Sequence, residues 1–223
     1  MAGKYQVGVV GLGNFGLRFG RALMEMGHEV AGVDNNMERV QQAKEVLTQV
    51  FEADAMNKQV LAQLSFSEYP YVLVSVGDSI SASTMITMYL KEMGVQTVWA
   101  KGLTGDHEKL LRKVGADEVI IPDKAAAKSL ADRLAIPGFL EYLPFGKDIV
   151  LREIVVDQWA GRTLKDLRLP DKYKIQIIAV KAKDGEGIRF IPKSGEAFNK
   201  GDVLVVMGHL QDLAHVREHQ IKP

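Results

Sequence analysis

The sequence predicts an α/β protein in which a doubly wound parallel sheet is followed by a small α+β module. Two observations favour this class: short apolar segments alternate with segments of helical periodicity over residues 5–121, and the pattern then changes to mostly strands after residue 147. The 223 residues are 47% apolar and 25% charged, which is typical of an ordered globular chain of one or two domains.

Six apolar segments of the first half are expected to form buried parallel strands. They cover residues 5–10, 29–34, 50–51, 71–76, 95–100 and 118–121. Helices are expected between them over residues 14–26, 38–47, 58–64, 82–93 and 106–114. Three of these helices stop next to Gly27, Gly94 or Gly115, as helices commonly do. Strict alternation implies right-handed crossovers and a Rossmann-like sheet.

The second half has a different pattern. A helix over residues 125–134 leads into Pro137, Gly138 and the run Pro-Phe-Gly at 144–146, which marks a boundary. Strands are then expected over residues 149–156, 175–180, 188–191 and 203–207, with a turn at 183–187 and helices over 163–167 and 211–218. The predicted organisation is a nucleotide-binding domain over residues 1–122, a crossover helix and linker over 123–146, and a C-terminal domain over 147–223.

Composition excludes several functional classes. The chain has no cysteine, so disulfides, thiol nucleophiles and cysteine-ligated metals are excluded. Its 28 basic and 28 acidic residues cancel, which argues against a nucleic-acid partner. No apolar run approaches the roughly 18 residues that a membrane span needs.

The first predicted strand runs into a GxGxxG element made of Gly11, Gly13 and Gly16, with Asn14 and Phe15 between the last two glycines. In this strand-turn-helix context the glycines allow a tight turn, close approach of a pyrophosphate, and packing of the helix on the strand. Asp34 ends the second strand, where a carboxylate accepts ribose hydroxyls and repels a 2′-phosphate. The pattern predicts a nucleotide site that disfavours NADP.

Further candidates lie at the carboxyl ends of the later strands, where ligands of open α/β sheets bind. They are Asn35, Asp54, Ala55, Gly77, Asp78 and Lys101. Asp54 is expected either to contact the base or to cap the following helix. Lys101 is expected either to meet a phosphate or to be solvated.

Catalytic equipment is not visible beside this site. None of the six tyrosines is followed by lysine four residues later, and the sequence contains neither GxSxG nor a GxxxxGK[ST] phosphate loop. A nucleotide site without such residues is typical of a sensor rather than an enzyme. A Rossmann-type NAD-dependent oxidoreductase remains the alternative.

Many separate segments together resemble the RCK-domain regulatory subunits of Trk- and Ktr-type potassium uptake systems. They are VVGLGNFG (9–16), GHEV (27–30), VD (33–34), Gly77 with AST (82–84), VWAK (98–101), VGAD (114–117), IPD (121–123), TLKDL (163–167), IAV (178–180) and KGDVL (200–204). The resemblance covers nearly the whole chain.

The resemblance implies a non-enzymatic cytoplasmic subunit, peripheral to the inner face of the membrane, whose Rossmann-like lobe binds ATP, ADP or NAD(H). Such subunits pair through these lobes and form an octameric ring under a membrane potassium-translocating subunit (TrkH/KtrB-like), and nucleotide exchange gates transport. The small C-terminal lobe of some relatives binds cyclic di-AMP, although no residue here is assigned to that ligand.

Two positions depart from the family pattern. Asn14 stands where Ktr-type members often carry an arginine that reaches the terminal phosphate of ATP, and an amide offers only neutral donors. Asp123 stands where they have a glutamate of a divalent-cation site. Its oxygens suit Mg²⁺ or Ca²⁺, and the other interpretation is that Asp123 caps the helix that follows.

Overall fold

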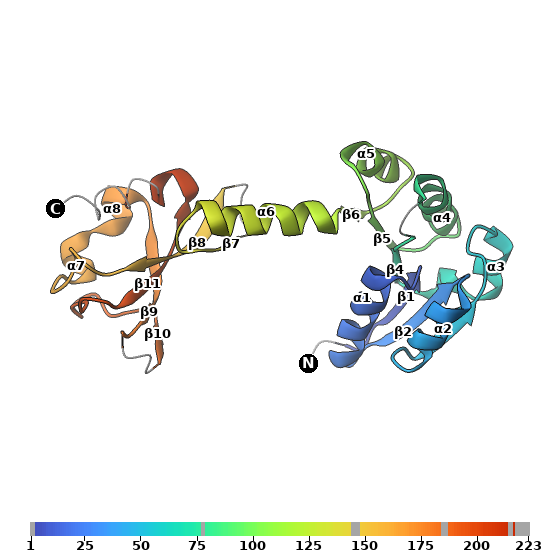
Figure 1. Cartoon of the computed structure of the whole chain (residues 1–223), viewed down its shortest axis with the longest axis horizontal. Helices are drawn as coiled ribbons and strands as arrows, with labels where there is room; N and C mark the ends of the chain where they lie inside the picture. Colours follow the sequence, from blue (N-terminus) through green and yellow to red (C-terminus); the bar gives the residue numbers. More distant parts are fainter. Residues whose placement is uncertain (1–2, 77–78, 144–147, 184–186, 214–215, 217–223) are drawn as a thin grey trace. The chain divides into compact units, whose positions relative to one another are not determined.

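The structure, a computed structural model, describes residues 3–76, 79–143, 148–183, 187–213 and 216. The chain divides into two compact units, Met1–Lys124 and Ala125–Pro223 (Figure 1). None of the helices within the described ranges is both long and apolar enough to cross a membrane.

The first unit is built on a six-stranded parallel sheet with the strand order β3-β2-β1-β4-β5-β6. The strands are β1 (Gln6–Val10), β2 (Glu29–Asp34), β3 (Gln49–Glu52), β4 (Tyr71–Val74), β5 (Thr97–Lys101) and β6 (Glu118–Ile120). The order reverses between β1 and β4, so their carboxyl ends border the crevice in which such sheets bind ligands. The predicted Rossmann-like sheet is confirmed.

Five helices connect these strands. They are α1 (Asn14–Glu25), α2 (Met37–Lys44), α3 (Lys58–Gln63), which is followed by the 3-10 turn η1 (Phe66–Glu68), α4 (Ile80–Glu92) and α5 (Gly105–Lys113). The side chains of Asn36, Asn57, Ser79 and Thr104 accept a backbone N–H at the starts of α2, α3, α4 and α5. α1 differs, because its N-cap is Gly13 and carries no side-chain cap.

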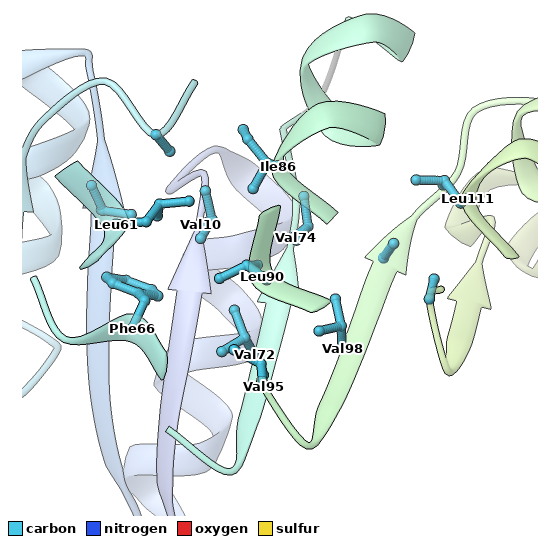
Figure 2. Packing of buried hydrophobic residues seen from close by; sticks show 14 of the residues in the cluster. Val10, Leu61, Phe66, Val72, Val74, Ile86, Leu90, Val95, Val98 and Leu111 are labelled. Carbon is cyan, nitrogen blue, oxygen red and sulfur yellow. The ribbon is translucent and has the colours of Figure 1, made fainter. Parts of the chain in front are cut away.

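Alternate residues of the central strands enter two separate cores. Val10, Val72 and Val74 point toward α3, α4 and α5 and pack with Leu61, Ile86 and Leu111 in the larger core (Figure 2). Val9, Val30 and Leu73 face the other way and pack against α1 and α2. The nearly continuous apolar sequence of β1 and β4 reflects this burial on both faces.

Strand β5 and the first residue of β4 lack cover on one face. Val98 and Ala100 of β5 are fully buried, whereas Trp99 between them keeps 40% of its surface exposed. Tyr71 at the start of β4 is 39% exposed. The sheet is thus doubly wound over β1–β3 and covered on one face over β5.

The segment after β6 differs from the expected helix and linker. α6 (Pro122–Ala135) starts three residues earlier than the expected 125–134, because Pro122 suits the first helical turn. The strand β7 (Phe139–Tyr142) lies inside the segment assigned to the linker and was not expected. It pairs with β8 (Ile149–Val155), which follows the linker. Pro137 and Gly138 end the helix and allow the turn, and a Cβ at Gly138 (φ +76°) would collide with the Glu153 carbonyl oxygen.

The second unit is a five-stranded antiparallel sheet of order β10-β9-β11-β8-β7. Its other strands are β8 (Ile149–Val155), β9 (Gln176–Lys181), β10 (Ile188–Phe190) and β11 (Val203–His209), with the short helices α7 (Leu164–Leu167) and α8 (Leu169–Tyr173). The predicted α+β module is confirmed. Sequence analysis missed α8, and most of the expected turn at 183–187 and helix at 211–218 lies outside the described residues.

Candidate nucleotide-binding site

Two of the three glycines of the motif are required by backbone contacts inside the protein. Gly11 has φ +92°, and a Cβ there would lie 2.6 Å from the Ser75 carbonyl oxygen. A Cβ at Gly16 would collide with the Gly11 carbonyl oxygen. These two glycines therefore fix the tight turn after β1 and the close packing of α1 on that turn.

Gly13 meets a different condition. It has φ −65°, which any residue adopts, and a Cβ there would meet no atom within 4 Å. The space beside it is open, and the first intrahelical bond is accepted by the Gly13 carbonyl from Leu17 N–H. Within the described part of the chain, the N–H groups of Asn14 and Phe15 have no acceptor. The N-terminus of α1 thus presents free donors and its positive dipole end, which suits a phosphate.

Asp34 joins the glycine turn to the end of β2. Its Oδ2 accepts the Leu12 N–H at 2.7 Å and its Oδ1 accepts the Asn36 N–H at 2.9 Å. The Arg39 guanidinium lies 3.6 Å from Oδ2. The residue is only 5% exposed, so it has a structural role, and its contact with a ribose stays a prediction. The carboxylate oxygens can still each accept a second hydrogen bond from a ribose hydroxyl.

A cavity of about 110 Å³ extends from Asp34 across the carboxyl ends of β1, β2, β3 and β4. Asn35, Asp54 and Ala55 line it, and their contact with a nucleotide stays a prediction. The structure therefore brings together Gly11, Asp34 and three of the later candidates around one cavity, and their apolar and carboxylate groups suit a base and a ribose.

Asp54 does not cap α3, so that alternative is wrong. Asn57 caps the helix by accepting the Gln59 N–H at 3.0 Å, and Asp54 lies one turn earlier, where its Oδ1 accepts the Met56 N–H at 2.9 Å. Gly77 and Asp78 lie outside the described residues. The Phe15 side chain packs on the core under α1 and α2, which leaves only its N–H to the site.

Lys101 and Asp123 lie away from this cavity. Lys101 ends β5, two strands from β1, and is not among the lining residues. Asp123 is exposed in the first turn of α6, one residue after the helix starts, so it does not cap a helix that begins at Lys124. In the ranges that the structure describes, no group of three or more His, Asp and Glu side chains could hold a metal ion. A cation at Asp123 stays a prediction.

A buried polar pair joins α4 to α5, and neither residue lines the cavity. His107 of α5 is 2% exposed, and its Nε2 lies 3.0 Å from Oγ of the fully buried Ser83 in α4. Its Nδ1 accepts the Leu103 N–H, so the proton belongs on Nε2. Ser83 in turn donates to the Ser79 carbonyl at 2.9 Å. Burial lowers the pKa of His107, which favours the neutral ring.

Sequence analysis missed several lining residues. Ser75, Met56 and Arg39 all line the cavity. Arg39 lies in the first turn of α2, only five residues after Asp34. This closeness to the end of a strand in the sequence was the signal that could have identified it. Ser75 is placed by its N–H, which donates to the Val10 carbonyl at 2.7 Å and extends the pairing of β4 with β1.

Fold and site together define a nucleotide-binding Rossmann-type lobe joined to a small second lobe. Comparison with known proteins gives the same division: the TrkA-N domain model matches residues 7–122, and the TrkA-C domain model matches residues 149–220. The chain is 34% identical to Ktr system potassium uptake protein C of Bacillus subtilis over 95% of each chain. It is 31% identical to Ktr system potassium uptake protein A of Vibrio alginolyticus over 96% of each.

Solved structures share the fold. The RCK domain of GsuK aligns over 96% of this chain with a TM-score of 0.54 and 18% identity, and this chain spans 46% of that one. The NAD-bound GsuK channel aligns with a TM-score of 0.55 and 17% identity, over 96% of this chain and 38% of the channel. The chain belongs to the TrkA family of RCK-domain proteins, the regulatory subunits of Trk- and Ktr-type potassium uptake systems.

Proposed function

We propose that this chain is the nucleotide-binding subunit that controls potassium flux through a separate membrane subunit, with ATP, ADP or NAD(H) as the controlling ligand. The observation that carries the proposal is the free N-terminus of α1 directly beside Asp34 and its cavity. Identity of 31–34% over nearly the whole length to Ktr potassium uptake proteins supports the transport role. The GsuK channel bound to NAD supports a dinucleotide as one of the candidate ligands.

The membrane partner and the location follow from the same proposal. A subunit of this kind acts from the cytoplasm, held at the inner face of the membrane by a potassium-translocating protein of the TrkH/KtrB kind. Ligand binding would change the contacts made on that protein, because a ligand shifts an equilibrium only by its differential affinity for two states. A divalent cation such as Mg²⁺ or Ca²⁺ at Asp123, and cyclic di-AMP in the second unit, remain further proposals.

Self-association is the second part of the proposal. An apolar patch on the first unit consists of Tyr5, Phe19, Leu23, Tyr71 and Trp99, which line a cavity of about 310 Å³. Tyr5, which directly precedes β1, and the strand residues Tyr71 and Trp99 keep 39–43% of their surface exposed. Contiguous exposed patches of this kind mark interaction surfaces. We assign the patch to pairing of two copies of this chain, as the first step toward an octameric ring.

Calorimetry on the full chain tests nucleotide binding. ATP, ADP and NADH are titrated separately, with Asp34→Asn as the site variant and Asp106→Asn, an exposed residue of α5, as the matched control. Binding by the parent and the control together with a loss of affinity in Asp34→Asn supports the site. The absence of binding by all three ligands to the parent protein would overturn the proposal.

Light scattering on the same samples tests assembly. A nucleotide-dependent change in an oligomeric mass supports the regulator, whereas a monomer of constant mass argues against the paired assembly. NADH turnover in the presence of carbonyl substrates would instead favour the oxidoreductase alternative, because a regulator binds the nucleotide without consuming it.

A further inference from the structure

A groove of about 500 Å³ runs along α1 and α2 beside the cavity at Asp34. It begins at Gly13 and Asn14 of the glycine turn, and the guanidinium groups of Arg18 and Arg21 on α1 and Arg39 on α2 line it. We call it the arginine groove. Arg39 lines both the groove and the cavity at Asp34, so the two spaces meet at that side chain.

The charges in the arginine groove are unbalanced. Three guanidinium groups line it together with a single carboxylate, that of Glu25. The side chains of Arg18 and Arg21 form neither an ion pair nor a hydrogen bond with other residues in the described ranges. Arg39 makes one long contact of 3.6 Å with Asp34, and half of its side chain is exposed. Three cations therefore converge on one groove with almost no internal counter-charge.

The spacing in the helix explains this convergence. Arg18 follows Asn14 by four residues, so both lie on the same face of α1, and Arg21 lies three residues further along that face. That face also ends at the free N–H groups of Asn14 and Phe15 described above. Guanidinium groups bind phosphate oxygens in a bidentate manner, and charge-assisted hydrogen bonds are about twice as strong as neutral ones.

We propose that the arginine groove binds a phosphate group of the bound nucleotide additional to the phosphate on the N–H groups of α1. This inference rests on the proposed nucleotide binding. Two ligands carry such a group: the terminal phosphate of ATP and the 2′-phosphate of NADP. Arg39 offsets the charge of Asp34 at the ribose edge, so Asp34 alone does not exclude a 2′-phosphate as the sequence suggested.

The test is calorimetry on the full chain with two matched ligand pairs, ATP against ADP and NADP against NAD, at constant ionic strength. The variant is Arg18→Gln with Arg21→Gln, which removes two charges but keeps polar, helix-favouring side chains. Arg112→Gln on α5 is the control, since Arg112 is an exposed arginine that lines neither space. Thermal unfolding of each protein verifies the fold, and the single variants replace the double variant if that one unfolds.

We expect the double variant to lose about tenfold or more in affinity for the ligand with the additional phosphate and less than about twofold for its partner ligand. A loss confined to ATP assigns the groove to the terminal phosphate, and a loss confined to NADP assigns it to the 2′-phosphate.

Three outcomes overturn the inference. They are unchanged affinities, an equal loss for both members of each pair, and a parent protein that binds ADP or NAD but neither ATP nor NADP. The last outcome leaves nucleotide binding itself intact. If the parent protein binds none of the four ligands, the proposed function fails and this inference fails with it.

Discussion

At the residue scale, the glycine motif contains positions with separate physical demands. Gly11 and Gly16 are required by backbone contacts inside the protein, whereas the space beside Gly13 is empty of protein atoms. The sequence predicted these roles because strand, turn and helix followed one another. It could not show that the groove beyond Gly13 is lined by arginines, since Arg18 and Arg39 come from different helices that only the folded chain brings together.

The glycines give a matched pair of substitutions. Gly16→Ala forces a methyl group against the Gly11 carbonyl oxygen, so we expect a loss of about 1–3 kcal/mol in the free energy of unfolding. Gly13→Ala adds the same group to open space at an ordinary φ, so stability should fall by about 1 kcal/mol or less, the cost of alanine at an N-cap, while nucleotide affinity falls. Urea unfolding and calorimetry measure the two effects. Equal stability losses in both variants would contradict this division.

Asp34 combines a structural and a binding role. Sequence analysis placed Asp34 at the end of the second strand, which does not show whether its side chain is buried. In the structure Asp34 is buried and accepts the Leu12 N–H, so its removal also takes away a contact of the fold. Residue position in the sequence does not reveal which backbone N–H a carboxylate will meet across the sheet.

We therefore expect Asp34→Ala to lower the free energy of unfolding by about 1–3 kcal/mol, because it leaves the buried Leu12 N–H without an acceptor. Asp34→Asn keeps one acceptor oxygen and should cost less. Both variants should bind nucleotide more weakly than the parent. Urea unfolding without ligand separates the two roles, and a parent-like stability of Asp34→Ala would show that the Leu12 contact contributes little.

At the element scale, helices with strong local signals were predicted to within a few residues. α1, α4 and α5 follow periodic apolar positions and end next to glycines, which the sequence shows directly. β7 and α8 were missed for physical reasons. β7 has only four residues and gains its backbone partners from β8. α8 begins next to Arg168, a non-glycine residue at φ +48°, and no local sequence pattern predicts that conformation.

The buried His107 at the contact between α4 and α5 predicts that the free energy of unfolding depends on pH. Burial lowers the pKa of His107 below its ordinary value near 6.5, so the unfolded chain takes up a proton before the folded one does. The free energy of unfolding should therefore decrease as the pH falls below about 6.5, and the contribution of neutral His107 is fully present above that value. A protonated ring would also lose the Leu103 N–H as a donor to Nδ1.

His107→Gln removes the titrating group, so the decrease in melting temperature between about pH 7.5 and pH 5.5 should be smaller than in the parent protein. His209→Gln removes an exposed histidine and is the control. Melting curves at both pH values for the three proteins decide the matter. A steeper decrease in His107→Gln than in the parent would reverse the sign argued here.

At the scale of the whole molecule, the two units have separate cores and separate sheets. Periodicity predicted both sheets, because the change from alternating helices and strands to mostly strands is a property of the sequence. The exposure of one face of β5 was not predicted, since Trp99 lies in an apolar segment that is typical of a buried strand. α6, which follows β6, has no buried residue among those described, and its Leu130 and Leu134 are 67% and 89% exposed.

The exposed patch gives the prediction that concerns assembly. If two copies pair through Tyr5, Tyr71 and Trp99, then Trp99→Glu places a carboxylate in the interface and should weaken the dimer by about tenfold or more, because an unpaired buried charge is costly. The fold should survive, since Trp99 is 40% exposed in the single chain. Met26→Glu is the control, because Met26 is 71% exposed and lies outside the patch.

Analytical ultracentrifugation over a concentration series measures the dissociation constants. A dimer as tight in Trp99→Glu as in Met26→Glu would move the interface away from β4 and β5, and nucleotide binding by a dissociated Trp99→Glu protein would show that the site on one chain is sufficient to hold the ligand.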